Sequence, residues 1–303
     1  MGCSSRHDLD QQTATGLHLH KTSGRQNSAA SRGRAMIRLI HMLRRAPGLS
    51  QQDFAAIWRD ANGPMVASLQ TDLDIVRYLQ VHADPGDQGL DAAASAARGG
   101  MLEPFDGIAE YWWKSPDALR TALSSAAGDA AARKLVASEN DFVDLPASPL
   151  WFAIEYPQVA TTLHRPVARY RSNVMRLHFA LRPLTALGEA GARRYWLEEH
   201  GPLIRSHSPV RGLLAYNQVH RCECPLLSAF TTPRGTTAAP FLGHAESWFE
   251  RPTGRQPPFD QPPFEMQVAM DAAIEDERNF IDWSVSTIRV GKELVFVDRE
   301  WAL

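Results

Sequence analysis

A histidine at position 200 has no counterpart in a closely matching stretch of the same chain. WLEEHGPL (196–203) nearly repeats WRDANGPM (58–65), but Asn62 stands in the first copy where His200 stands in the second. Imidazole titrates near neutral pH and can accept or give a proton there, whereas an amide cannot. The Gly-Pro pair in both copies predicts a shaped helix end, because proline has no backbone N–H to donate. We therefore predict His200 as a general acid or base; the alternative is that it only hydrogen-bonds to the backbone at the kink.

The two stretches belong to an internal duplication that covers most of the chain. An offset of 138 residues relates many positions, and it shortens to 136 between GIAEYWW (107–113) and GHAESWF (243–249). The pairs at offset 138 include Arg38 with Arg176, Leu39 with Leu177, Tyr78 with Tyr216, Gln80 with Gln218, and His82 with His220. We predict one domain at 35–160 and a second at 172–300. A polar segment at 1–34 precedes them, with the composition of a disordered tail.

Each copy predicts the same order of elements. A short strand rich in branched residues is followed by a helix, two strands, an Ala-rich helix (about 116–140 in the first copy) and a final strand. This β-α-β-β-α-β order is the ferredoxin-like arrangement. A four-stranded sheet with helices on one face leaves its other face bare, and two such faces can cover each other. The predicted fold class is α+β, with two tandem ferredoxin-like repeats packed as an intrachain barrel.

Alternation along the strands predicts which side chains face the barrel interior, since successive strand residues point to opposite faces. One parity of the second copy carries polar and aromatic side chains in three strands, and we expect these to surround one cavity. The predicted substrate-binding residues are Arg176, His178, Tyr216, Gln218, His220, Glu246 and Trp248. Such a cavity suits a small apolar or aromatic ligand. Alternatively, these polar side chains bond to one another and hold the two halves in register.

Composition excludes several classes of protein. The chain has 303 residues, 44% of them hydrophobic, and a net charge of −2 without a basic stripe, which argues against a nucleic-acid partner. No apolar run approaches the roughly 18 residues of a membrane-spanning helix. Three cysteines indicate a reducing, cytoplasmic setting. We expect no nucleotide cofactor, because no glycine-rich phosphate loop occurs. We also expect no metal, because His220, Cys222 and Cys224 lack the spacing of a zinc site.

The motifs together resemble those of the EthD family, within the dimeric α+β barrel superfamily. The resemblance rests on MIRLIHMLRR, a helix, W-x-x-x-H-G-P, R-Y-x-Q-x-H and G-x-A-E-x-W, over about residues 35–300 in two copies. It implies a cofactor-independent oxidoreductase acting on a small aromatic or polyketide-like compound, with His200 as acid/base. A lyase or isomerase (a polyketide cyclase, dehydratase or lactone isomerase) and a non-catalytic binding module are the alternatives. Distant relatives include haem enzymes; if this chain bound haem, His200, His178 or His220 would be the axial ligand.

Two further expectations follow from the duplication. Because both halves of the barrel lie in one chain, we expect a monomeric pseudo-dimer or a weak homo-oligomer. The turn-rich segment 225–241 predicts a flexible lid over a mouth in the second half.

Overall fold

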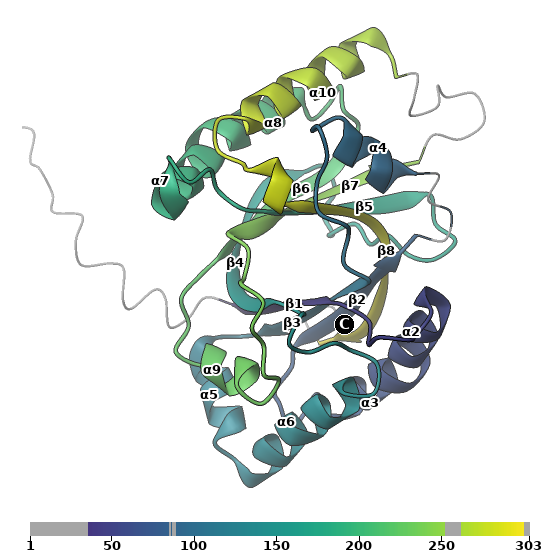
Figure 1. Ribbon diagram of the computed structural model, residues 1–303, viewed down its shortest axis with the longest axis vertical. Helices are drawn as coiled ribbons and strands as arrows, with labels where there is room; N and C mark the ends of the chain where they lie inside the picture. Colours follow the sequence, from purple (N-terminus) through teal and green to yellow (C-terminus); the bar gives the residue numbers. More distant parts are fainter. Residues whose placement is uncertain (1–35, 85, 87–88, 252–261, 300–303) are drawn as a thin grey trace, which may run out of the picture.

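Eight antiparallel strands form a closed barrel in the computed structural model (Figure 1). The structure describes residues 36–84, 86, 89–251 and 262–299, so the predicted tail at 1–34 lies outside the described residues. The strands are β1 (Ile37–Leu43), β2 (Arg77–Ala83), β3 (Gly107–Trp113), β4 (Leu150–Ala160), β5 (Val174–Leu181), β6 (Leu213–Arg221), β7 (Gly243–Glu250) and β8 (Thr287–Asp298). Their spatial order is β1-β3-β2-β8-β5-β7-β6-β4.

The two halves of the chain contribute equal arcs of the barrel. The first half supplies β4-β1-β3-β2 and the second supplies β8-β5-β7-β6, so equivalent strands take equivalent places. The arcs join where β2 pairs with β8 and β4 pairs with β6. Closure leaves none of these strands with a free edge, and exposed edges are where strands of other chains would add.

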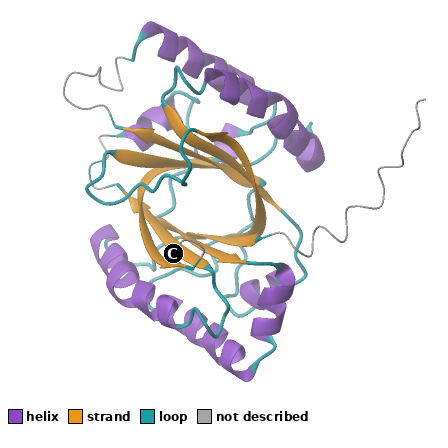
Figure 2. Cartoon of the chain, turned by 180° about the vertical axis from the view of Figure 1, so that it is seen from behind, coloured by secondary structure: helices purple, strands orange, loops and turns teal. Residues whose placement is uncertain are grey.

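Helices cover the barrel from two opposite sides (Figure 2). The helices of the first half are α2 (Gln51–Ile57), α3 (Gly63–Ser68), α4 (Leu90–Ala96), α5 (Pro116–Leu123) and α6 (Ala126–Glu139). Those of the second are α7 (Gly188–Tyr195), α8 (Gly201–His207), α9 (Leu227–Thr231), α10 (Phe264–Glu277) and the short η3 (Trp283–Val285). No helix in the described part of the chain has the length and apolar character needed to cross a membrane.

The single Ala-rich helix predicted at about 116–140 is wrong, because two serines divide it. The Ser124 hydroxyl donates to the Arg120 carbonyl at 2.8 Å, which ends α5. The Ser125 hydroxyl then accepts the Gly128 N–H at 2.9 Å and caps α6. Serine competes for backbone groups in this way and favours helix ends over helix interiors.

The Gly-Pro pairs do not end their helices as predicted. A π-helical turn, η1 (Trp58–Asn62), joins α2 to α3, and η2 (Trp196–His200) joins α7 to α8. The N–H of Gly63 donates five residues back to the Trp58 carbonyl, and Gly201 does the same to Trp196. The shifted register places each proline in the first turn of the next helix, where a missing N–H costs little.

Three packed layers bury the apolar side chains. The outer layers lie between the helices and the sheet, around Trp58 in the first half and Trp196 in the second, so both tryptophans are core residues. The third lies inside the barrel and includes Ile40 and Met42. Residues of β1 alternate between the two sides of the sheet, since Leu39 packs in an outer layer and Ile40 packs inside the barrel.

Two segments cross from one half of the chain to the other. Helix α4 lies beside the helices of the second half, and α9 lies beside those of the first (Figure 1). Arg98, just after α4, donates to both oxygens of Glu277 on α10 at 2.6 and 2.8 Å. Arg234, just after α9, donates to both oxygens of Glu139 on α6 at 2.7 and 3.1 Å. The lid predicted at 225–241 is therefore wrong, because this segment is packed onto the first half.

We expect Arg98→Met to lower the free energy of unfolding by about 3 kcal/mol, because it leaves the carboxylate of Glu277 buried and unpaired. Adding Glu277→Gln should recover part of the loss. Urea denaturation of the single and double variants measures both effects. Arg133→Met, which breaks an exposed pair with Asp129, is the control and should cost under about 1 kcal/mol. Equal losses at Arg98 and Arg133 would contradict a stabilising role for the crossed segments.

Candidate functional site

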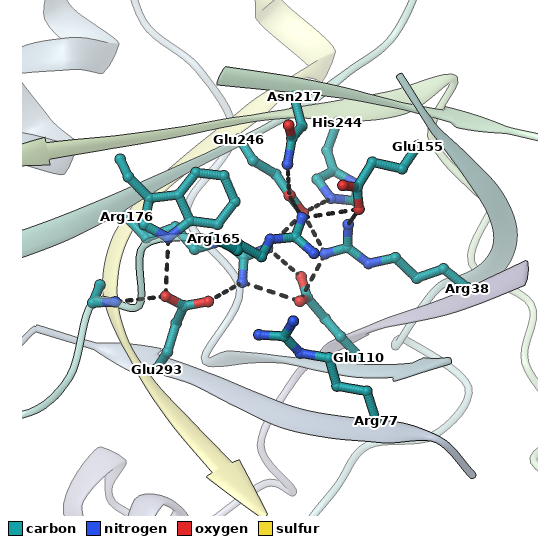
Figure 3. Close-up of polar contacts among 12 residues, drawn as sticks. Arg38, Arg77, Glu110, Glu155, Arg165, Arg176, Asn217, His244, Glu246 and Glu293 are labelled. Atoms are coloured by element: carbon teal, nitrogen blue, oxygen red, sulfur yellow. Dashed lines mark hydrogen bonds and ion pairs between the residues drawn. The ribbon is translucent and has the colours of Figure 1, made fainter. Parts of the chain in front are cut away.

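Two arginines and two glutamates meet at the centre of the barrel (Figure 3). Arg38 and Glu110 come from the first half, and Arg176 and Glu246 hold the matching positions in the second. Arg176 donates to the two Glu110 oxygens at 3.0 and 2.6 Å, and it also pairs with Glu246. Arg38 lies 2.7 Å from Glu110 and pairs with Glu246 as well. Each arginine thus bridges one carboxylate of each half.

Three more charged residues, Glu155, Arg165 and Glu293, contact these four. Arg38 reaches Glu155 at 3.3 Å and Arg176 reaches Glu293 at 2.9 Å, the two glutamates being related by the same offset of 138. Arg165 pairs with Glu155 at 2.8 Å and with Glu246 at 3.1 Å. Burial alone would raise the pKa of Glu246, but Arg176 and Arg38 hold that pKa well below its usual range. Arg176 and Arg38 also lower the pKa of Glu110, so within this central cluster of charged residues the carboxylates of Glu110 and Glu246 stay ionised.

Two histidines of the second half complete the interior. The rings of His178 on β5 and His244 on β7 are stacked, with centroids 3.9 Å apart. His244 Nε2 lies 2.7 Å from Glu246 Oε1. Burial, more than the neighbouring charges, lowers the pKa of both histidines. The first half has Ile40 and Ile108 at these positions, so the interior is not symmetric.

The expectation that Tyr216, Gln218 and His220 face the barrel interior is wrong. They point toward the helices: Gln218 Nε2 donates to the Trp196 carbonyl at 2.7 Å, and its Oε1 lies 3.0 Å from His220 Nε2. The His220 ring stacks on Trp196 at 4.3 Å, and the Tyr216 hydroxyl accepts the indole N–H. Burial lowers the pKa of His220 to about 3. This group docks the π-helical turn onto β6, and its Gln and Trp have the same contact in the first half.

The predicted site residues therefore fall into two groups. Arg176, His178, Glu246 and Trp248 lie inside the barrel, where the Trp248 indole N–H donates to Glu293 at 2.9 Å. His200 joins Tyr216, Gln218 and His220 in the helical layer of the second half. The wall of the barrel separates the two groups.

His200 forms a dyad with a carboxylate that the sequence did not reveal. Its Nδ1 lies 2.7 Å from Oδ2 of Asp276 on α10, and the Tyr195 hydroxyl donates to the other oxygen at 2.7 Å. Burial would raise the pKa of Asp276, but the hydrogen bonds from His200 and Tyr195 lower it overall. In the first half the same positions hold Asn62 and Ser138, joined by a 3.0 Å hydrogen bond. The sequence does contain a sign of this pair. At the offset of 138 residues, His200 corresponds to Asn62 and Asp276 corresponds to Ser138, so both positions differ between the two halves.

A dyad of this kind can transfer a proton. A carboxylate bound to Nδ1 fixes the imidazole tautomer and leaves Nε2 to act as base or acid. Nε2 has no hydrogen-bond partner among the residues that the structure describes.

An apolar pocket of about 510 Å³ lies in the helical layer of the first half. It is bounded by the outer face of β1 and β3, by α6, and by α9 with the residues after it. Its walls include Leu39, Ile75, Tyr111, Trp113, Leu135, Val136 and Phe230. A second cavity, of about 490 Å³, opens at the barrel mouth beside Arg38, Arg77 and Trp112. The first is the more suitable for an apolar ligand, because charged groups crowd the second.

The histidines proposed as haem ligands do not fit that role. His220 is stacked on Trp196 and His178 is stacked on His244, whereas His200 binds Asp276 through Nδ1 and keeps Nε2 open. Neither of the two cavities described above is lined by any of them, and a haem needs a cavity beside its axial ligand.

Comparison with known proteins identifies one domain. Residues 46–146 match the family model of the EthD domain. The solved structure of a proposed monooxygenase from Lactobacillus acidophilus NCFM is 10% identical, with a TM-score of 0.43, covering 87% of this chain and 97% of that one. An anthrone oxidase-like protein is 12% identical, with a TM-score of 0.44, covering 89% and 97%. No curated protein matches the sequence.

We expect His41→Phe to flatten the pH dependence of stability. His41 lies fully buried, with Nδ1 4.0 Å from Glu139, and burial followed by Arg234 lowers its pKa well below the usual value. The unfolded chain gains a proton there below about pH 6.5, whereas the folded chain does not, so stability is lost as the pH falls. Phe179 holds this position in the second half. Between pH 6 and 5 the variant should lose about 1 kcal/mol less than wild type in urea denaturation; parallel curves would contradict this.

Proposed function

We propose, on the premise that residues 46–146 are an EthD domain, that the protein binds a small aromatic or polyketide-like molecule in the apolar pocket of that domain. We further propose that the protein is a cofactor-independent oxidoreductase. The two halves would be tandem ferredoxin-like repeats, 35–160 and 172–300, which their matching strand order supports.

The pocket of the first half is the observation that carries the binding proposal. Its volume of about 510 Å³ falls within the range of small-molecule sites, which are mostly apolar with a few polar groups. Tyr111 and Trp113 line its sheet side. The Arg234 guanidinium donates to Glu139 and to the Phe230 carbonyl, so it needs no anionic group from a ligand. A neutral aromatic molecule suits this lining better than a charged one.

The dyad of His200 and Asp276 supports the catalytic proposal. His200 Nε2 would remove a proton from an acidic C–H beside an aromatic ring, and Asp276 would stabilise the imidazolium that forms. The carbanion would then reduce dioxygen, so that the CH₂ group becomes C=O and the second oxygen atom leaves as water. His200 lies across the barrel from the pocket of the first half, so this reaction requires a second molecule bound in the second half.

A lyase or isomerase is the second candidate, and the same dyad favours it, because proton transfer between substrate atoms needs no oxidant. An oxygen electrode separates the two: turnover with one O₂ consumed per product supports the oxidoreductase, and turnover without oxygen uptake supports the lyase or isomerase.

We expect hydroxylated aromatic compounds to raise the melting temperature of wild type by several degrees at saturating concentration. Ala132→Met should reduce that shift, because it fills the pocket of the first half with the residue that the second half carries at position 270. His200→Asn, which copies Asn62, should keep most of the shift and lose turnover by at least about 100-fold. A shift that is unchanged in Ala132→Met and disappears in His200→Asn would place the ligand in the second half alone.

A further inference from the structure

We propose that Glu110, His178 and His244 bind a first-row transition-metal ion at the centre of the barrel. One ligand atom from each residue lies within 4.8 Å of the other two, and all three residues are buried. Imidazole nitrogen and carboxylate oxygen together suit zinc, copper, iron and nickel. This site differs from both the pocket of the first half and the dyad of His200 and Asp276, so the proposal stands apart from the proposed function.

His178 is the residue that most needs a further partner. Its ring is fully buried, and neither nitrogen has a hydrogen-bond partner among the residues that the structure describes. Leaving a buried polar atom unsatisfied costs about 1–3 kcal/mol, and such atoms often mark the place of an ion or a water. A metal ion bound to one of the two nitrogens would supply the missing interaction.

His244 has the arrangement of a metal-binding histidine. Its Nε2 lies 2.7 Å from Glu246 Oε1, whereas its buried Nδ1 has no partner in the described part of the chain. Histidines that bind metals commonly hold a carboxylate with the nitrogen that faces away from the ion. Burial lowers the pKa of both His178 and His244, so each ring keeps a lone pair available at neutral pH.

Glu110 has room for one more bond despite its two arginines. A carboxylate offers about four lone-pair directions. Arg176 uses one on each oxygen, and Arg38 uses a second one on Oε2, which leaves one on Oε1. Ligands at about 2.0–2.2 Å from one ion lie about 3–4 Å apart, so the three ligand atoms must move closer, and the stacked rings of His178 and His244 must turn so that both face the ion.

The first half shows that the barrel does not need these imidazoles for packing. Ile40 and Ile108 occupy the positions of His178 and His244, and both pack in the apolar interior. Replacing isoleucine by histidine loses apolar burial and adds polar atoms that need partners. Two such changes at stacked positions point to a ligand that the second half holds and the first does not.

The test measures metal binding by the full-length protein. After removal of metal with a chelator, Zn²⁺ and, separately, Cu²⁺ are titrated by isothermal calorimetry, and the metal retained after gel filtration is measured by mass spectrometry. We expect one ion per chain for at least one of the two metals, with a Kd below about 1 μM. Wild type that binds neither metal at one ion per chain would overturn the proposal without any variant.

Matched variants assign the ion to this site. His178→Ile and His244→Ile copy the first half and should weaken binding at least about 100-fold. His41→Phe removes an equally buried histidine outside the site and should bind as wild type does. Circular dichroism confirms that each variant is folded. Binding that survives in folded His178→Ile would place the ion elsewhere and reject these three residues as its ligands.

Discussion

Arg38 and Arg176 each contact both Glu110 and Glu246, and the remaining structure is arranged around these contacts. A buried charge is tolerated only with a partner at close range, and removing one partner leaves the other uncompensated. Each half brings one arginine and one glutamate, so neither half could close this network alone. A shift of either sheet by two residues would separate the pairs. The network therefore specifies the register in which the two halves meet.

The sequence predicted most of the architecture because the patterns that indicate strands and helices occur twice, once in each half. Strand alternation correctly placed Arg176, His178, Glu246 and Trp248 inside the barrel, because polar and apolar residues alternate along β5 and their neighbours on β7 follow the same pattern. It failed for Tyr216, Gln218 and His220, because β6 is buried on both faces and alternation cannot then tell them apart. The deciding contact is the Trp196 carbonyl, which Gln218 reaches. The π-helical turn positions this carbonyl, and no periodicity in the sequence predicts such a turn.

The candidate sites were only partly visible for the same reason. His200 was apparent as a departure from its repeat, but Asp276 lies 76 residues further on, and only the structure pairs them. The pocket of the first half depends on α9 of the second half, and nothing in the order of elements indicates that crossing. The central cluster was foreseen as one of two alternatives, either a ligand cavity or bonds that hold the halves together. The ion pairs favour the second alternative for Arg176 and Glu246.

The crossing of α4 and α9 makes the chain resemble a domain-swapped dimer whose two copies have been fused. Each half carries the cationic latch for its neighbour: Arg98 closes onto Glu277, and Arg234 closes onto Glu139. A fragment ending between β4 and β5 would keep Arg98 without Glu277, and Glu139 without Arg234. The linker between the halves thus raises the effective concentration of each half for the other, and each half supplies the ion-pair partners of the other. Because one chain carries both halves, the two need not be identical: the first holds an apolar pocket, and the second holds paired histidine and carboxylate groups.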